Sequence, residues 1–304
     1  MRKLIAGIIL GTALLCGTKT HAQYNREYFF WVGRSCMMNN DYQEAIRTLN
    51  TLLRFDEDAF EGYFLRGIAK YNLDDLLGAD TDFSAAIVKN PVFTTAYIYR
   101  ALTRTRMGNY DDALQDFREA IDLRPDLPDA YYSRGYTRLQ NKQYEEAIED
   151  FDKFIFQENK VADAYIGRGT AYLYLKDTVR ALENFDQAIR TNRENPNGYY
   201  QRGTLLLQKE EYARAEADFD MSIRCDSAFL PPYFNRAVVY SNTNRPMQAL
   251  ADFDRVLQLD STNSFTYFNR AILRTQIGDY NRALDDFDRV ALYSPGNVQV
   301  YYLR

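Results

Sequence analysis

The pentapeptide YYQRG at residues 199–203 returns in closely similar form along this chain. It stands as YFLRG at 63–67, as YYSRG at 131–135 and as YFNRA at both 233–237 and 267–271, and the chain ends on YYLR at 301–304. The arginine of this phrase recurs every 34 residues without insertion or deletion, as Arg66, Arg100, Arg134, Arg168, Arg202, Arg236, Arg270 and Arg304. A fixed period of this size is typical of stacked-repeat proteins.

Other columns keep the same register when the arginine is placed at position 7 of each unit. Position 4 is aromatic, position 8 is Gly or Ala, position 20 is Ala, and position 24 is Phe in all units but the first. Apolar or small residues at 4, 8 and 11, and again at 20, 24 and 27, follow helical spacing. A polar break such as MGNYDD at 107–112 separates the two sets, so each unit is predicted to be two antiparallel helices joined by a short turn. The units run 26–59, 60–93, 94–127, 128–161, 162–195, 196–229, 230–263 and 264–297, with a partial unit at 298–304.

These columns resemble the tetratricopeptide repeat over residues 26–304. The resemblance implies an all-α, right-handed superhelical solenoid of antiparallel helix pairs, occupying residues 23–304. The chain departs from the family pattern at position 7, which is usually Leu and here is Arg. It also departs at position 27, where Leu52 and Phe154 replace the usual Ala.

The N-terminus has the pattern of a secretory signal peptide over residues 1–22. Arg2 and Lys3 precede the apolar run LIAGIILGTALLCG at 4–17, and small residues lead up to Ala22. The run is short for a permanent membrane anchor, and Leu15 before Cys16 disfavours lipidation. We therefore expect an exported bacterial protein, periplasmic or secreted, with no transmembrane segment after cleavage.

Composition argues against catalysis and against nucleic acid. The only histidine, His21, lies in the predicted signal peptide, and the sequence has no phosphate loop, GxSxG, HExxH or CxxC motif. Loss of Arg2, Lys3 and Lys19 lowers the 37 basic residues to 34 against 42 acidic ones, a net charge of −8. We expect no enzyme activity, no cofactor, no metal site and no nucleic-acid partner. Two thiols remain, Cys36 at the predicted buried position 11 and Cys225, and both are expected to be free.

An acidic column accompanies the arginines. Position 23, beside the buried stripe of the second helix, is Asp in six units and Asn184 in another. We predict structural ion pairs, within a unit or with the preceding one, because a partly buried guanidinium needs an acidic partner. The alternative is that the arginines line a site for an acidic ligand. The aspartates at position 25, such as Asp254, are expected to face solvent. The predicted pairs involve Arg66, Arg100, Arg134, Arg202, Arg236 and Arg270 with Asp82, Asp116, Asp150, Asp218, Asp252 and Asp286.

The family resemblance implies a concave groove, lined by the first helices at positions 2, 5, 9, 12 and 13, that binds a protein or peptide. The aromatic column at position 5 either lines this groove or packs between neighbouring first helices. The Lys and Asn residues with which some family members bind a C-terminal carboxylate are absent. The candidate groove residues are Phe64, Tyr71, Arg106, Tyr132, Tyr136, Gln140, Tyr174, Tyr200, Gln208, Asn242 and Gln276.

The partial unit at 298–304 lacks a second helix to cover it, which favours either a longer protein or self-association through this end.

The repeat resemblance and the absence of catalytic motifs together lead us to expect a non-enzymatic protein-interaction scaffold. The alternative is the recognition segment of a longer enzyme or signalling protein, and a third, weaker option is a small ligand such as a glycan.

Overall fold

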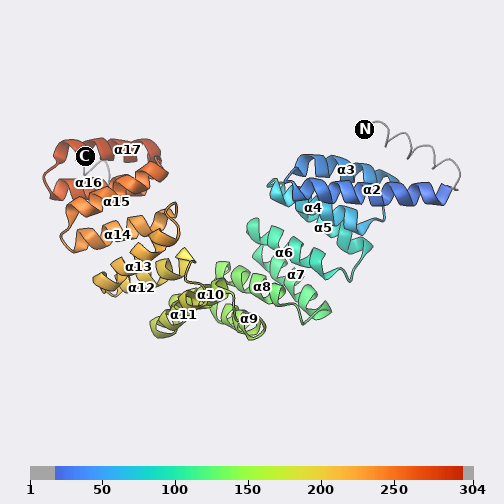
Figure 1. The fold of residues 1–304 in the computed structure, drawn as a ribbon, viewed down its shortest axis with the longest axis horizontal. Helices are drawn as coiled ribbons and strands as arrows, with labels where there is room; N and C mark the ends of the chain where they lie inside the picture. The colour runs from blue at the N-terminus through green and yellow to red at the C-terminus, as the bar shows by residue number, and fades with distance from the viewer. Residues whose placement is uncertain (1–17, 297–304) are drawn as a thin grey trace. The chain divides into compact units, whose positions relative to one another are not determined.

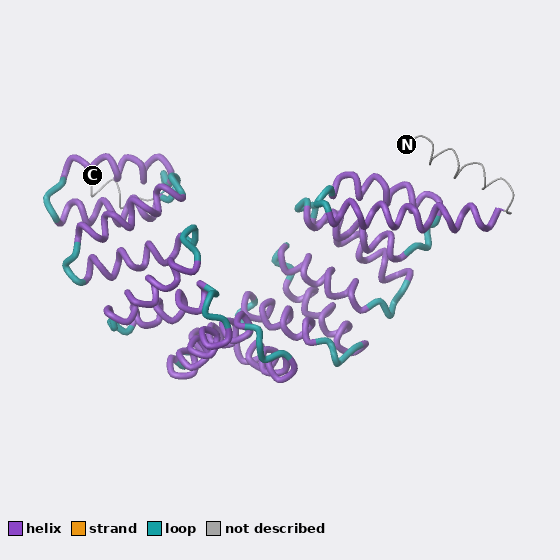
Figure 2. The backbone as a smooth tube through the Cα atoms, viewed as in Figure 1, coloured by secondary structure: helices purple, strands orange, loops and turns teal. Residues whose placement is uncertain are grey.

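The computed structural model describes the backbone of residues 18–296 and the side chains of residues 26–296. Within this range the chain forms sixteen α-helices and no strand (Figures 1 and 2). The first helices of the repeats are α2 (Thr18–Met38), α4 (Phe60–Asn72), α6 (Thr94–Arg106), α8 (Pro128–Gln140), α10 (Ala162–Tyr174), α12 (Pro196–Gln208), α14 (Leu230–Asn242) and α16 (Ser264–Gln276). The second helices are α3 (Tyr42–Phe55), α5 (Leu76–Lys89), α7 (Tyr110–Leu123), α9 (Tyr144–Gln157), α11 (Thr178–Thr191), α13 (Tyr212–Cys225), α15 (Pro246–Leu259) and α17 (Tyr280–Tyr293).

The chain divides into two compact units, residues 1–143 and 144–304. The first contains α2 to α8 and the second contains α9 to α17. Within each unit, every helix packs against the one before it and the one after it. The predicted all-α repeat of helix pairs is therefore confirmed, and the division falls inside the fourth predicted repeat.

The turn inside each repeat depends on one residue with a left-handed backbone at position 15. The φ angle is +80° at Gly108 and +84° at Gly278. The other six repeats place a non-glycine residue there, with φ between 58° and 65°: Asn40, Asp74, Lys142, Lys176, Glu210 and Asn244. An L-residue pays a steric cost in this region, which is small for Asn and Asp and larger for Lys and Glu.

In every repeat but the first, a phenylalanine ring at position 24 lies at the centre of the core, between two helices that approach closely. Phe83, Phe117, Phe185 and Phe219 have no exposed surface, and the alanines at position 20 are also buried. A Cβ atom added at Gly67 would lie 2.7 Å from the ring of Phe83. The small residue at position 8 is therefore required by the ring at position 24, because close-packed interiors leave no room for both groups to be large.

The first helices lie on the inner side of each stack. In the first unit α2 contacts α4, α4 contacts α6 and α6 contacts α8, and in the second unit α10 contacts α12 and α12 contacts α14. Among the described helices, successive second helices make no comparable contact. Each stack therefore curves toward its first helices, which is the side that the family resemblance assigned to partner binding.

The helices described here include none long and apolar enough to cross a membrane. The predicted cleavage point after Ala22 falls within α2, which begins at Thr18. The apolar run at 4–17 and the partial repeat at 298–304 lie outside the described residues, so the predictions made for them stand as predictions.

Candidate functional site

The arginine at position 7 forms a two-pronged ion pair with the aspartate at position 23 of its own repeat. In α4, Arg66 donates from Nε to Oδ2 of Asp82 at 2.8 Å and from Nη2 to Oδ1 at 2.6 Å. Asp82 is buried, which is typical of a carboxylate whose oxygens are satisfied by charged donors. The same arrangement joins Arg100 to Asp116, Arg202 to Asp218, Arg236 to Asp252 and Arg270 to Asp286.

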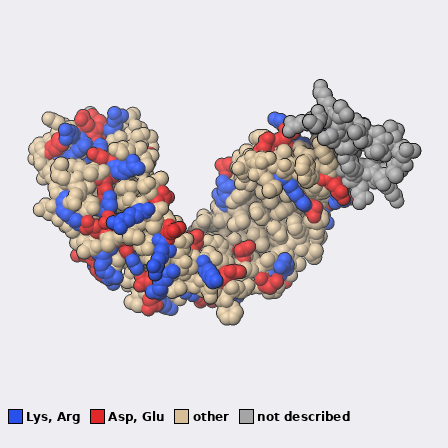
Figure 3. Space-filling model, in the orientation of Figure 1, with Lys and Arg blue, Asp and Glu red and all other residues tan. Residues whose placement is uncertain are grey.

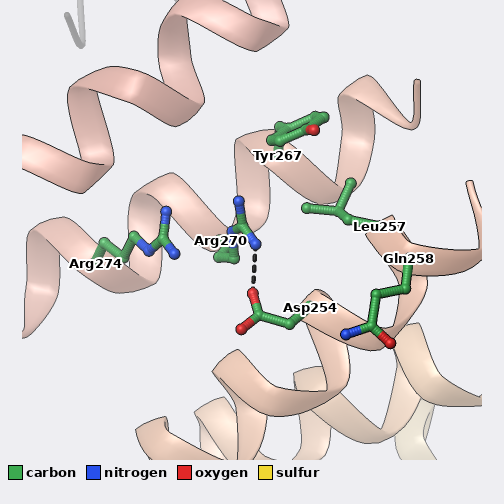
Figure 4. A pocket seen from close by; sticks show the side chains of 6 residues that line it. All are labelled: Asp254, Leu257, Gln258, Tyr267, Arg270 and Arg274. Carbon is green, nitrogen blue, oxygen red and sulfur yellow. Dashed lines mark hydrogen bonds and ion pairs between the residues drawn. The ribbon is translucent and has the colours of Figure 1, made fainter. Parts of the chain in front are cut away.

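The remaining guanidinium nitrogen of these arginines, Nη1, donates a hydrogen bond to the side chain at position 25 of the preceding repeat. Nη1 of Arg202 donates to Asp186 and Nη1 of Arg236 donates to Asp220, both at 2.6 Å. Arg270 binds Asp254 in the same way (Figure 4). As expected, the position-25 aspartates face solvent, with 50% of the Asp254 side chain exposed, but stacking of the repeats also places the next arginine beside each of them. We call this series of intra-repeat and inter-repeat pairs the arginine ladder.

The ladder differs in the fifth repeat, where position 23 is Asn184 instead of an aspartate. Arg168 donates to the amide oxygen of Asn184 at 2.8 Å and to Asp152 at 2.5 Å, so it has a single carboxylate partner. Asn184 is held in place because its amide nitrogen donates to the backbone oxygen of Arg180. The predicted pair of Arg134 and Asp150 joins residues on either side of the division between the two units, and it stays a prediction.

The tyrosine of the recurring pentapeptide lies under the arginine. The guanidinium carbon of Arg66 is 5.4 Å from the ring centre of Tyr63, and that of Arg270 is 5.4 Å from the ring of Tyr267. A guanidinium over an aromatic face is stabilised by the ring's electron density. The spacing of three residues between Tyr and Arg is thus explained by contacts within one turn of the helix.

Position 11 holds a second cation in several repeats, although an apolar or small residue was expected there. Lys70 lies 2.8 Å from Asp82, and Nη1 of Arg104 donates to Asp116 at 2.9 Å. Arg274 donates to Asp286. The expectation was wrong because a long basic side chain can pack its apolar stem in the stripe while its charged end reaches the buried aspartate. Cys36, also at position 11, is only partly buried, and both Cys36 and Cys225 are free thiols.

Burial and ion pairing shift the pKa values of individual ladder groups in the second unit. Hydrogen bonds to Asp218 raise the pKa of the Arg202 guanidinium, and they outweigh the opposing effect of burial. Burial raises the pKa of the Asp252 carboxyl above its ordinary value despite the hydrogen bond from Arg236. The charged groups of the ladder are hydrogen-bonded to one another, so they are not left open for an acidic ligand. We therefore interpret the ladder as a structural feature.

The rings at position 5 pack into the core rather than project from it. The ring centre of Phe64 lies 5.8 Å from that of Phe83 and 4.9 Å from that of Phe93. Tyr200 packs in the same way between Phe219 and Phe229. Of the two alternatives for this column, the contacts favour packing between helices, with one edge of each ring left partly exposed.

Position 13 is the clearly exposed column of the first helices. From the third repeat onward the residues there are Arg106, Gln140, Tyr174, Gln208, Asn242 and Gln276, and all are exposed. No hydrogen bond occupies the side-chain amides of Gln208, Asn242 and Gln276 among the described contacts of the second unit. We define the first-helix face as the surface formed by positions 2, 5, 9, 12 and 13 of the first helices.

Several candidate residues of the first-helix face are engaged with each other. The Arg106 guanidinium lies 4.6 Å from the ring centre of Tyr71 and donates to Asp74 at 2.7 Å, which links two repeats of the first unit. Tyr132 and Tyr136 are also neighbours, with ring centres 5.0 Å apart. These contacts organise the face without removing it from solvent.

Tyr174 in the second unit is stacked on Tyr144, with ring centres 4.8 Å apart. Its side chain is nevertheless 60% exposed. Stacking on Tyr144 therefore leaves most of the Tyr174 side chain open to solvent.

A cavity of about 390 Å³ lies between α15 and α16 (Figure 4). Its lining is charged, but Arg270 binds Asp254 and Asp286, and Arg274 binds Asp286. The positive charges are thus already neutralised, and we assign this cavity no ligand. In the part of the chain that the structure describes, His, Cys, Asp and Glu side chains form no group that could hold a metal ion.

Family models match three internal stretches of the chain. A model described as TPR repeat matches residues 101–142, and one described as tetratricopeptide repeat matches residues 166–228. Both descriptions name the repeat that the sequence pattern resembles, so the chain contains tetratricopeptide repeats. A model of anaphase-promoting complex subunit 5 matches residues 234–291, and no curated protein sequence matches the chain significantly.

Solved structures show the same fold at low sequence identity. A tetratricopeptide-repeat protein from Parabacteroides merdae is 19% identical, with a TM-score of 0.62 over 80% of this chain and 96% of that one. Yeast Tom70 is 20% identical (TM-score 0.64, 86% of this chain and 56% of that one). A chain of the Cut9–Hcn1 complex is 12% identical (TM-score 0.64, 90% and 54%). This chain therefore spans about half the length of the latter two, and at these identities the likeness concerns the fold alone.

Proposed function

We propose that this tetratricopeptide-repeat protein is a non-enzymatic interaction scaffold that binds a segment of a partner protein on its first-helix face. The observation that carries the proposal is the exposed column at position 13, set on helices whose own polar groups are satisfied by the arginine ladder. A rigid scaffold with an exposed face loses little conformational entropy when it binds. One of the structurally similar chains was crystallised as part of the Cut9–Hcn1 hetero-tetramer, which is consistent with this role.

An affinity capture with matched variants tests the proposal. The bait is the full chain, and the prey is an extract of the source organism that includes its envelope. The amide variant combines Gln208→Glu, Asn242→Asp and Gln276→Glu, which keeps side-chain size and adds charge at exposed sites. The control variant makes the same kind of change at three exposed positions of second helices, Gln157→Glu, Gln248→Glu and Asn281→Asp.

We expect a partner that the wild-type chain and the control variant retain and that the amide variant loses. Cross-linking followed by mass spectrometry is then expected to place the contact on the first helices. A partner that all three baits retain equally, or one cross-linked only to second helices, would contradict the proposal.

We also propose that the chain is exported and cleaved after Ala22. The support is the charged start, the short apolar run and the small residues before the cleavage point. Intact-mass analysis of the protein from fractionated cells is expected to find a chain that begins at Gln23 outside the cytoplasm. A full-length chain confined to the cytoplasm would show the opposite.

A further inference from the structure

The first helices of the second unit carry few charged residues. Outside the arginine ladder they hold only Arg274, at position 11, and Asp163. Across α10, α12, α14 and α16 the basic residues are Arg168, Arg202, Arg236, Arg270 and Arg274, and each is bound to an acidic or amide partner. The only acidic residue in these four helices is Asp163, which accepts a hydrogen bond from Asn195 at 2.8 Å. Apart from Asp163, positions 2, 5, 9, 12 and 13 of these helices are therefore all uncharged. We call this part of the first-helix face the neutral face.

The neutral face contrasts with the rest of the molecule. Charged residues make up 26% of the chain, and Figure 3 shows basic and acidic side chains intermixed over the visible surface of the second unit. In the first unit, the same positions include Glu61, Arg106 and Asp129. The lack of charge on the neutral face is thus a local property of four helices and does not follow from the composition.

The neutral face combines an apolar floor with a polar edge. Half-buried rings and aliphatic side chains at positions 5 and 9, such as Tyr200, Phe234 and Ile272, form the floor. Phe265 at position 2 is 65% exposed and lies beside Phe234, with ring centres 5.1 Å apart. The exposed amides at position 13 form the edge along one side. A side-chain amide both donates and accepts hydrogen bonds, as does a peptide group.

We propose that the neutral face binds an extended, uncharged and apolar-rich segment of the partner protein, whose main chain bonds to the amides of Gln208, Asn242 and Gln276. This inference rests on the proposed function and specifies the partner's chemistry. A charged side chain laid on this face would lose water and find no ion partner, because the ladder arginines are already occupied. A neutral segment loses no charge hydration, covers the floor with its side chains and leaves its peptide groups for the amides.

The test is selection from a display library of random peptides of about 12 residues, which span about 40 Å when extended. The full chain is the target, and selected peptides are synthesised and their affinities measured. Each is measured against the wild-type chain, the amide variant and the control variant defined above. Each measurement is made at about 50 mM and about 500 mM NaCl, because added salt weakens charge-based binding and leaves neutral contacts nearly unchanged.

The expected result is a set of peptides depleted in Asp, Glu, Lys and Arg relative to the input library. Their affinity should fall about tenfold or more in the amide variant, stay constant in the control variant, and change less than about twofold with salt. Peptides that depend on the amides but are enriched in charge, or that weaken about tenfold with salt, would overturn this inference and leave the scaffold function intact. If no selected peptide depends on the amides, the scaffold function at this face falls together with the inference.

Discussion

At the scale of single residues, the buried aspartates of position 23 are the most consequential groups in the molecule. Asp218 is buried and accepts both parallel hydrogen bonds from Arg202, while Arg202 also binds Asp186 in the preceding repeat. Removing one partner of a buried ion pair leaves the other charge without water and without compensation. The net contribution of each buried pair to the free energy of unfolding is therefore expected to be small. Loss of one partner is expected to cost much more, because the other charge stays buried and unpaired.

Replacing Asp218 with Ala is expected to destabilise the protein by about 3–5 kcal/mol, because Arg202 then loses its main partner inside the fold. Asp218→Asn should cost less, since Asn184 already accepts from Arg168 at the same position of another repeat. Thermal and urea unfolding measure both. The control is Asp126→Ala in the exposed pair with Arg124, which should cost less than about 1 kcal/mol. Equal costs for the buried and the exposed aspartate would show that the ladder is not structural.

The ion pair of Glu216 with Arg245 predicts a pH dependence. Hydrogen bonds from Arg245 lower the pKa of the Glu216 carboxyl from its usual 4.5, so the folded state binds a proton less readily than the unfolded chain. The stability from this pair is therefore fully present above pH 4.5 and is lost as the pH falls through the lowered pKa. Glu216→Gln should lower the melting temperature at neutral pH, and the difference from wild type should shrink in strong acid. A difference that grows on acidification would contradict the assignment.

At the scale of the helix pair, the turn residue at position 15 decides how well each pair closes. Every repeat adopts the left-handed conformation there, yet only Gly108 and Gly278 adopt it without steric cost among the described turns. The backbone geometry is imposed by the two helices that the turn joins. The identity of the turn residue is thus free to vary at a modest cost in stability.

We expect Lys176→Gly and Glu210→Gly each to stabilise the protein by up to about 1 kcal/mol. Relief of the steric cost of the left-handed conformation exceeds the entropy that glycine adds to the unfolded chain. Melting temperatures of the single and double variants measure the effect. The reverse change, Gly108→Lys, is the matched control and should destabilise by a similar amount. Stabilisation by the control would refute the conformational explanation.

At the scale of the whole molecule, each repeat contacts only its neighbours, so stability should be local. Phe219 has no exposed surface and packs with Leu206, Ala215 and Val239, which come from three successive helices. Loss of such a ring destabilises its own repeat and the interfaces on either side. Repeats further along the chain do not share those contacts.

Phe219→Ala is therefore expected to speed amide hydrogen exchange in α12, α13 and α14 while leaving α2 to α5 unchanged. Phe83→Ala is the matched variant in the first unit, and it should speed exchange in α4, α5 and α6 instead. Uniform acceleration over the whole chain in either variant would mean that the protein unfolds as one cooperative block.

By itself, the sequence determined the helix pairs and the core, because an unbroken 34-residue period repeats the same helical pattern in every unit. It also indicated which residues form the ladder, since a buried arginine column beside an aspartate column leaves little choice of partner. The tertiary structure decided what depends on stacking. Asp254 meets Arg270 only because consecutive repeats lie side by side, and Lys70 joins Asp82 only because its stem fits the buried stripe. The neutral face of α10, α12, α14 and α16, whose one charged residue is Asp163, is likewise not evident in the linear sequence. There its positions are separated by ladder arginines, and only folding sorts the occupied charges away from the exposed face.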